Sequence, residues 1–121
     1  MRLRYDSWFV PLARVFGVGP SSSTIAVDGP DLHVQMGWAF DAAIPLASVA
    51  SATAIAKSPL GRGVHTRGNG VWVVNASGTG CVELTIDPPA KARAAGFGIT
   101  LRKLTLSVDD PEALINACPR V

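Results

Sequence analysis

The chain has 121 residues, a net charge of +2 and hydrophobic residues at 48% of its positions. A chain of this length forms one domain that needs neither disulfides nor a structural metal to fold, and its apolar content excludes a disordered chain. The mild positive charge is smaller than the basic excess typical of nucleic-acid binders, so we expect no nucleic acid as a partner.

The cellular location follows from cysteine usage and from apolar run lengths. Cys81 and Cys118 are too few for a disulfide framework, so we expect two reduced thiols. The first six residues lack the apolar centre of a signal peptide, and no apolar run approaches the roughly 20 residues that span a bilayer. These features predict a single cytoplasmic domain over residues 1–121.

Residues 1–22 are expected to form an N-terminal extension before the main domain. Arg2–Val10 reads either as a strand or as a short amphipathic segment that ends at Pro11, because proline lacks the N–H that a central strand needs. Leu12–Gly17 reads either as a helical turn or as a second short strand.

Alternating apolar residues predict four strands after this extension. Thr24–Val27 and Leu32–Met36 flank a turn of aspartate, glycine and proline, which together favour a reversal of the chain. A third strand is expected over Trp38–Ile44, with Trp38 on its apolar face. The β-branched residues of Val49–Ala56 favour a fourth strand.

Val71–Asp87 is expected to form a central hairpin, in which two apolar strands flank a polar turn rich in glycine. Pro88–Pro89 should stop the second strand. Ala90–Gly98, which carries Lys91 and Arg93, then reads as a loop or a short turn.

The C-terminal part predicts a last strand and then a helix. Ile99–Val108 alternates, but its apolar residues change phase near Arg102, so we expect a bulge there. Asp109–Cys118 reads as a helix, because an aspartate caps its start and Pro111 lies in the first turn, where a missing N–H costs nothing. The predicted strands therefore span residues 24–108 and the helix residues 109–118.

This order of about seven strands and one helix resembles the pleckstrin-homology-like (PH-like) domains of bacteria, over Thr24–Cys118. The resemblance implies a mostly β protein, an antiparallel barrel or sandwich capped by the C-terminal helix. It implies no chemistry, since the fold hosts lipid, peptide and protein binding. The Asp28–Asp31 turn is acidic, whereas lipid-binding PH domains of eukaryotes have a basic loop there. Leu106–Leu114 resembles the strand-to-helix junction of bacterial PH-like domains. The segments similar to uncharacterised actinobacterial proteins of that fold are Gly37–Phe40, Ile44–Leu46, Gly63–His65 and Trp72–Asn75.

Residue types that build metal or nucleophilic sites do not converge in this sequence. A metal site needs three or four ligands close together, but His33, His65, Cys81 and Cys118 occur at unrelated spacings. We therefore expect no metal and no other cofactor. Cys81 with a nearby His65 remains the one nucleophilic alternative.

Acid–base and phosphate sites find equally little support. Paired catalytic carboxylates would require Asp41, Glu83 and Asp87 to meet in space. The glycines of Gly17–Ser22 and Gly63–Gly70 lack the other residues of phosphate-binding loops. We therefore predict that the protein is not an enzyme.

The best binding candidate is Lys57–Asn69, the longest segment without a strand or helix pattern. It contains Lys57, Arg62, His65 and Arg67 and no acidic residue. Arginine offers planar donors for phosphate or carboxylate, and histidine adds charge at about pH 6. The alternative is a solvated loop whose charges only keep the protein soluble.

Three functions stay open at this point. The first is a non-catalytic PH-like module that binds a protein or peptide. The second is peripheral binding to anionic lipid or a small anion through the basic loop 57–67, which would weaken strongly with salt. The third is an enzyme whose active site the sequence does not reveal.

Overall fold

The computed structural model describes residues 3, 5, 7, 8, 10–15, 19, 23–55, 63–75, 77 and 79–118, and only the backbone of residues 12–14, 63, 65 and 67. These residues form one eight-stranded sheet with a helix at its C-terminal end, which confirms the predicted mostly β class. None of the helices in this part of the chain has the length and apolar content of a membrane span.

The elements follow one another as strands joined mainly by short turns. The strands are β1 Ser23–Asp28, β2 Asp31–Met36, β3 Phe40–Pro45, β4 Val49–Ile55, β5 Gly63–Gly68, β6 Val71–Asn75, β7 Cys81–Ala94 and β8 Phe97–Ser107. The helices are α1 Val10–Val15, the 3-10 helix η2 Leu46–Ser48 and α2 Pro111–Ala117.

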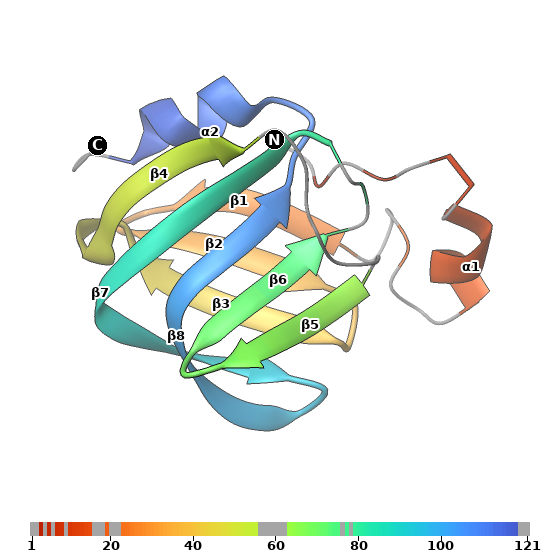
Figure 1. Cartoon of the computed structure of the whole chain (residues 1–121), viewed down its shortest axis with the longest axis horizontal. Helices are drawn as coiled ribbons and strands as arrows, with labels where there is room; N and C mark the ends of the chain where they lie inside the picture. Colours follow the sequence, from red (N-terminus) through yellow and green to blue (C-terminus); the bar gives the residue numbers. More distant parts are fainter. Residues whose placement is uncertain are drawn as a thin grey trace.

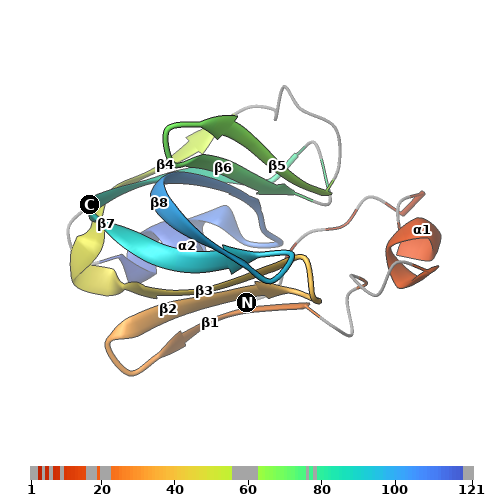
Figure 2. The same cartoon turned by 90° about the horizontal axis from the view of Figure 1, so that it is seen from below.

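Hydrogen bonds join the strands in the order β1-β2-β3-β7-β8-β6-β5, and β4 pairs with β7 outside this path. The sheet bends into two layers and does not close into a barrel. β1, β2 and β3 form one layer, β4, β5 and β6 lie in the other, and β7 and β8 run through both (Figure 2). α2 covers the β4 side of the space between the layers, whereas α1 lies outside both (Figure 1).

β7 is long because one half of it lies in each of the two layers. Its first half, residues 81–86, pairs with β4. In its second half, residues 90–94, the last three residues, Ala92 to Ala94, pair with β3. β8 pairs with both halves, but residues 86–89 of β7 stand opposite Arg102 alone. Such a bulge bends a strand, and this one carries β7 from one layer to the other. The irregularity lies at Arg102, as expected, but the extra residues are in β7 and not in the last strand, where the bulge was predicted.

The core fills the space between the layers with aliphatic side chains. Alternation is strict in β2 and β3, where every second side chain is buried. Burying one large apolar side chain contributes about 1.5–3 kcal/mol. The largest fully buried residues are Ile25, Leu32, Val34, Met36, Phe40, Ile44, Val49, Leu84, Leu101, Leu104, Leu106 and Leu114.

α2 has the start that the sequence predicts. The side chain of Asp110 accepts a hydrogen bond from the backbone N–H of Ala113 at 3.1 Å, and Pro111 begins the helix. Leu114 and Cys118 are buried against the core. The Cys118 thiol donates to the carbonyl oxygen of Leu114 at 3.3 Å, and burial raises the pKa of this thiol.

The expected central hairpin is wrong in its pairing. β6 and β7 are both strands, but β8 lies between them. β6 pairs with β8 in parallel, with Val71 opposite Lys103 and Val74 opposite Leu106. The sheet is therefore not antiparallel throughout. The strand patterns were local signals, whereas the choice of neighbour depends on contacts that are distant in sequence.

The expected end of the strand at Pro88–Pro89 is also wrong. β7 continues to Ala94 and turns through Ala95–Gly96 into β8, so Ala90–Gly98 is a hairpin rather than a loop. The two prolines lie where the register shifts. They are tolerated because no regular ladder to β8 requires an N–H donor at these positions, and proline has none.

Two further segments differ from the expectation. Gly63–Gly68 is strand β5, although it lies within the segment expected to be irregular. Trp38 is 64% exposed in the turn before β3, because this strand begins only at Phe40.

The N-terminal extension touches the core near its start. Leu3 forms a β-bridge with Val108 and is buried, and the Tyr5 hydroxyl lies 2.7 Å from Oγ of Ser23. Pro11 is part of helix α1 and does not end a strand.

Candidate functional site

The outer face of the layer formed by β1, β2, β3, β7 and β8 carries polar and small side chains. Side chains alternate along each strand, so those between the buried positions point outward. Cross-strand pairing and strand alternation place them in two rows. The first row is Ala26, His33, Ala43, Lys91 and Thr100, and the second is Thr24, Gln35, Asp41, Arg93 and Gly98.

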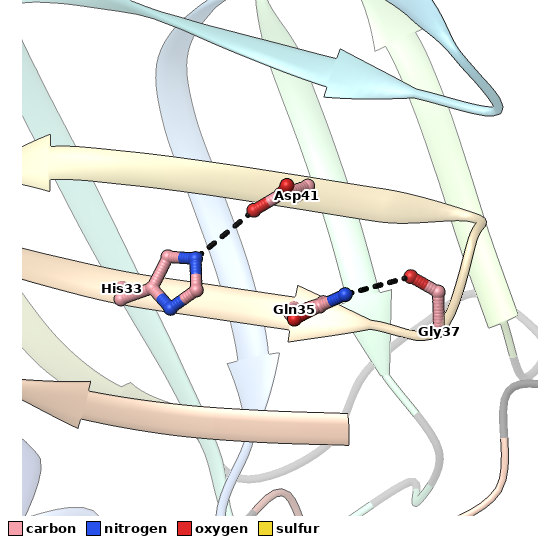
Figure 3. Close-up of polar contacts among 4 residues, drawn as sticks. All are labelled: His33, Gln35, Gly37 and Asp41. Carbon is pink, nitrogen blue, oxygen red and sulfur yellow. Dashed lines mark hydrogen bonds and ion pairs between the residues drawn. The ribbon is translucent and has the colours of Figure 1, made fainter. Parts of the chain in front are cut away.

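His33 and Asp41 interact across two strands of this face (Figure 3). Nε2 of His33 lies 3.1 Å from Oδ1 of Asp41. The two side chains are 39% and 55% exposed, so the contact contributes at most about 1 kcal/mol to stability. Its structural effect is to direct the Asp41 carboxylate toward β2. Beside it, Nε2 of Gln35 donates to the carbonyl oxygen of Gly37 at 3.4 Å.

Lys91 and Arg93 are two cations on the outer side of β7. They alternate with buried alanines, so both point away from the core. Neither forms an ion pair with another described residue. Asp41 stands opposite Arg93 in the sheet register, but the contact of its carboxylate is with His33. Two cationic groups are therefore available to a ligand.

Two shallow troughs lie on either side of these cations. The β3–β7 trough has a volume of about 370 Å³ and is bounded by His33, Asp41 and Ala43. The β7–β8 trough has a volume of about 400 Å³ and is bounded by Gly98 and Thr100. Lys91 and Arg93 belong to both, so the two cations form a ridge between the troughs.

A third hollow lies at the bulge of β7 and has a volume of about 530 Å³. Its lining contains Asp87 as well as Arg102 and Lys103. Lys103 also lies 3.8 Å from Glu83. This hollow therefore mixes acidic and basic groups, whereas the ridge on β7 is purely cationic.

Two exposed aromatic side chains stand at the end of the layer that carries the ridge. Trp38 lies in the β2–β3 turn, and Phe97, 75% exposed, follows the β7–β8 turn. The turns are neighbours, because the N–H of Ala95 donates to the carbonyl oxygen of Ala39 at 2.9 Å. Exposed aromatic residues are enriched at binding surfaces.

The four residues predicted for binding are only partly covered by the structure. Lys57 and Arg62 lie outside the described residues. His65 and Arg67 belong to β5, where only their backbone is described. β5 ends the sheet in the layer away from β2 and β3 (Figure 1). The basic segment thus remains a prediction, separate from the ridge on β7.

The nucleophilic alternative finds little support at Cys81. Its side chain is 1% exposed, and its sulfur contacts the carbonyl oxygens of Ser77 and Thr79 at 3.7 and 3.8 Å. A substrate has no access to a thiol buried in this way.

The carboxylates considered for acid–base catalysis occupy different parts of the sheet. Asp41 contacts His33, whereas Glu83 lies beside Lys103 in the other layer. Within the described part of the chain, no three residues among histidine, cysteine, aspartate and glutamate gather around a common point.

The sequence carried a signal for Lys91 and Arg93 that the prediction passed over. Ala90, Ala92 and Ala94 alternate with the two cations, which is the pattern of a strand with one buried face. Alanine is a poor strand former and Pro88–Pro89 comes before this segment, and both features favour a loop when the sequence is taken alone.

The chain was compared with protein-family models, with curated proteins and with solved structures. No family model matches it. No curated protein and no solved structure matches it either.

Proposed function

We propose that this protein is a non-catalytic module that binds an acidic segment of a partner protein or peptide on the ridge of Lys91 and Arg93. The main support is that both cations are exposed beside two troughs and form no ion pair with a described residue. Side-chain carboxylates of a partner would supply the missing negative charge.

The chemistry of the two cations fits carboxylate ligands. Arg93 offers a planar guanidinium that can hold a carboxylate through two hydrogen bonds, and Lys91 offers a compact ammonium. At an exposed site each contact contributes at most about 1 kcal/mol. The proposal therefore describes weak, salt-dependent binding, in which charge sets partner choice and association rate.

We also propose that the protein is cytoplasmic and that its fold is PH-like. Cys81 and Cys118 are buried thiols and not a disulfide, which supports a reducing compartment. The two-layer sheet capped by α2 supports the PH-like resemblance, and the parallel pair of β6 and β8 is a departure from the antiparallel sheet expected from it.

Fluorescence anisotropy with a labelled octaglutamate peptide at low salt tests the proposed site. The variant Lys91→Glu/Arg93→Glu should weaken binding by about tenfold or more, since two contacts of up to about 1 kcal/mol are replaced by repulsion. Arg62→Glu/Arg67→Glu is the matched control, because it changes net charge equally within the segment first predicted to bind.

The comparison of the two double variants decides between the sites. A loss confined to the Lys91/Arg93 variant supports the ridge. A loss confined to the Arg62/Arg67 variant would assign binding to the basic segment, and equal losses would indicate attraction to net charge alone. Unchanged melting temperatures must accompany each result, so that unfolding is not read as lost binding.

A second candidate is peripheral binding to an anionic membrane surface. The observation that favours it is the pair of exposed aromatics, Trp38 and Phe97, at neighbouring turns beside Arg93. Aromatic side chains settle at membrane interfaces and cations attract anionic lipids. Co-sedimentation with anionic but not neutral vesicles, lost in Trp38→Ser/Phe97→Ser, is the expected result; equal sedimentation of this variant would contradict it.

A further inference from the structure

We propose that the ligand is an extended segment with acidic residues at alternate positions, and that it lies in the β7–β8 trough. This inference rests on the proposed function and adds to it a trough, a ligand conformation and a spacing. Three observations carry it: the distribution of acidic groups, the spacing of the two cations and the space at Gly98.

The acidic groups distinguish the two troughs. The β3–β7 trough contains the Asp41 carboxylate, whose side chain is 55% exposed. That carboxylate repels an acidic ligand at short range. The lining of the β7–β8 trough contains no acidic residue. Both troughs offer Lys91 and Arg93, so an acidic segment favours the side toward β8.

The spacing of the cations sets the spacing of the ligand. Lys91 and Arg93 are two residues apart on one face of a strand, so their Cα atoms are roughly 6.6–6.8 Å apart. An extended peptide repeats its side chains on one face with the same period. Acidic residues at positions i and i+2 therefore meet both cations at once, whereas residues at i and i+1 point to opposite sides.

The β7–β8 trough has room for a peptide chain because the residue opposite Arg93 is Gly98, which has no side chain to fill the trough. A Cβ atom built on Gly98 meets nothing within 4 Å, so the space above this residue is open. Thr100 stands opposite Lys91 and is exposed, which places a hydroxyl donor beside the second cation. The Thr100 hydroxyl and the two cations thus offer side-chain donors along the trough.

Space at Gly98 also supplies a direct test. Gly98→Val places a branched side chain in the β7–β8 trough. It suits the strand because valine favours this conformation and because nothing lies within 4 Å of an added Cβ atom. Ala43→Val is the matched control, because it adds bulk to the β3–β7 trough at an exposed position. Thr100→Leu is a second way to fill the β7–β8 trough if Gly98→Val lowers the melting temperature.

The experiment measures competition against the labelled octaglutamate peptide. The competitors are capped hexapeptides of serine with two glutamates at positions i and i+1, i and i+2, or i and i+3. We expect the i, i+2 peptide to compete at roughly three- to fivefold lower concentration than the others, the effect of one additional exposed ion pair. Gly98→Val should weaken the octaglutamate complex at least fivefold, and Ala43→Val should leave it unchanged.

The outcomes separate this inference from the proposed function. Equal competition by the three peptides, or equal competition by inorganic phosphate, would overturn the extended segment while acidic binding at the ridge stands. Weakening by Ala43→Val alone would move the ligand to the β3–β7 trough. Failure of octaglutamate to bind at low salt would overturn the proposed function itself.

Discussion

The two halves of β7 belong to one strand but differ in what lies on each side. The inner face of the first half carries Val82, Leu84 and Ile86, and its outer Glu83 lies beside Lys103. The second half has only alanines inside, and outside it Lys91 and Arg93 form no ion pair with a described residue.

This difference gives the two halves of β7 different roles, the first in stability and the second in binding. The first half buries large side chains between two neighbouring strands, and α2 contacts β7 and also β4, the partner of this half. The second half contributes little apolar area per residue but presents its charges beside two troughs. We conclude that substitutions before the bulge should affect folding, whereas those after it should affect binding.

The largest expected effect is on the core of the first half. Leu84→Ala should lower the free energy of unfolding by about 2–5 kcal/mol, because Leu84 is fully buried and the truncation leaves a cavity. Ala92→Gly, at the buried position of the second half, should cost only about 0.5–1 kcal/mol. Urea unfolding measures the free energy of unfolding of both variants. Similar losses in the two variants would contradict the proposed difference between the halves of β7.

The next effect lies at the bulge that divides the halves. Gly70 has φ +78°, and a Cβ atom there would lie 2.9 Å from Cγ of Arg102 and 3.1 Å from the Thr100 carbonyl oxygen. Gly70→Ala should therefore cost about 1–3 kcal/mol. Gly98→Ala is its control, because its Cβ meets open space, and it should leave stability unchanged or raise it slightly. Equal costs for the two alanine variants would contradict this local account.

A smaller effect is expected from the cap of α2. Asp110→Ala removes the acceptor of the Ala113 N–H and should cost about 0.5–2 kcal/mol, whereas Asp110→Asn should retain most of the stability. Since α2 contacts β4 and β7, amide exchange should accelerate in the first half of β7 more than in the second. Uniform acceleration along β7 would show that the halves do not open separately.

The smallest effect on stability is expected at the ridge. Lys91→Ala/Arg93→Ala should change the free energy of unfolding by less than about 0.5 kcal/mol, because both side chains are exposed and make no ion pair within the described chain. The same variant should lose binding of octaglutamate. A large loss of stability would show that the cations serve the fold.

The sequence predicted the elements whose signals are local. Alternation and turn chemistry located β1 and β2, and capping located α2. The parallel neighbour of β6 was missed, because no local pattern states which distant strand will pair. The continuation of β7 through Pro88–Pro89 was missed because its tolerance depends on a bulge formed with β8.

The candidate site was less predictable than the fold. The sequence favours the segment Lys57–Asn69 for binding, because Arg62 and Arg67 cluster there with no acidic residue. Lys91 and Arg93 become a ridge only through their position on β7, and the troughs beside them depend on Ala43 and Gly98 in neighbouring strands. Such cross-strand arrangements follow from register, which the sequence alone did not determine.

One measurement tests the central claim most directly: a titration of the isotope-labelled protein with the capped i, i+2 diglutamate peptide, followed by amide chemical shifts. The account predicts that the largest shifts cluster at Lys91, Arg93, Gly98 and Thr100 and fade with added salt. Shifts that cluster in β5 or along the first half of β7 would contradict the claim that the second half of β7 is the binding surface.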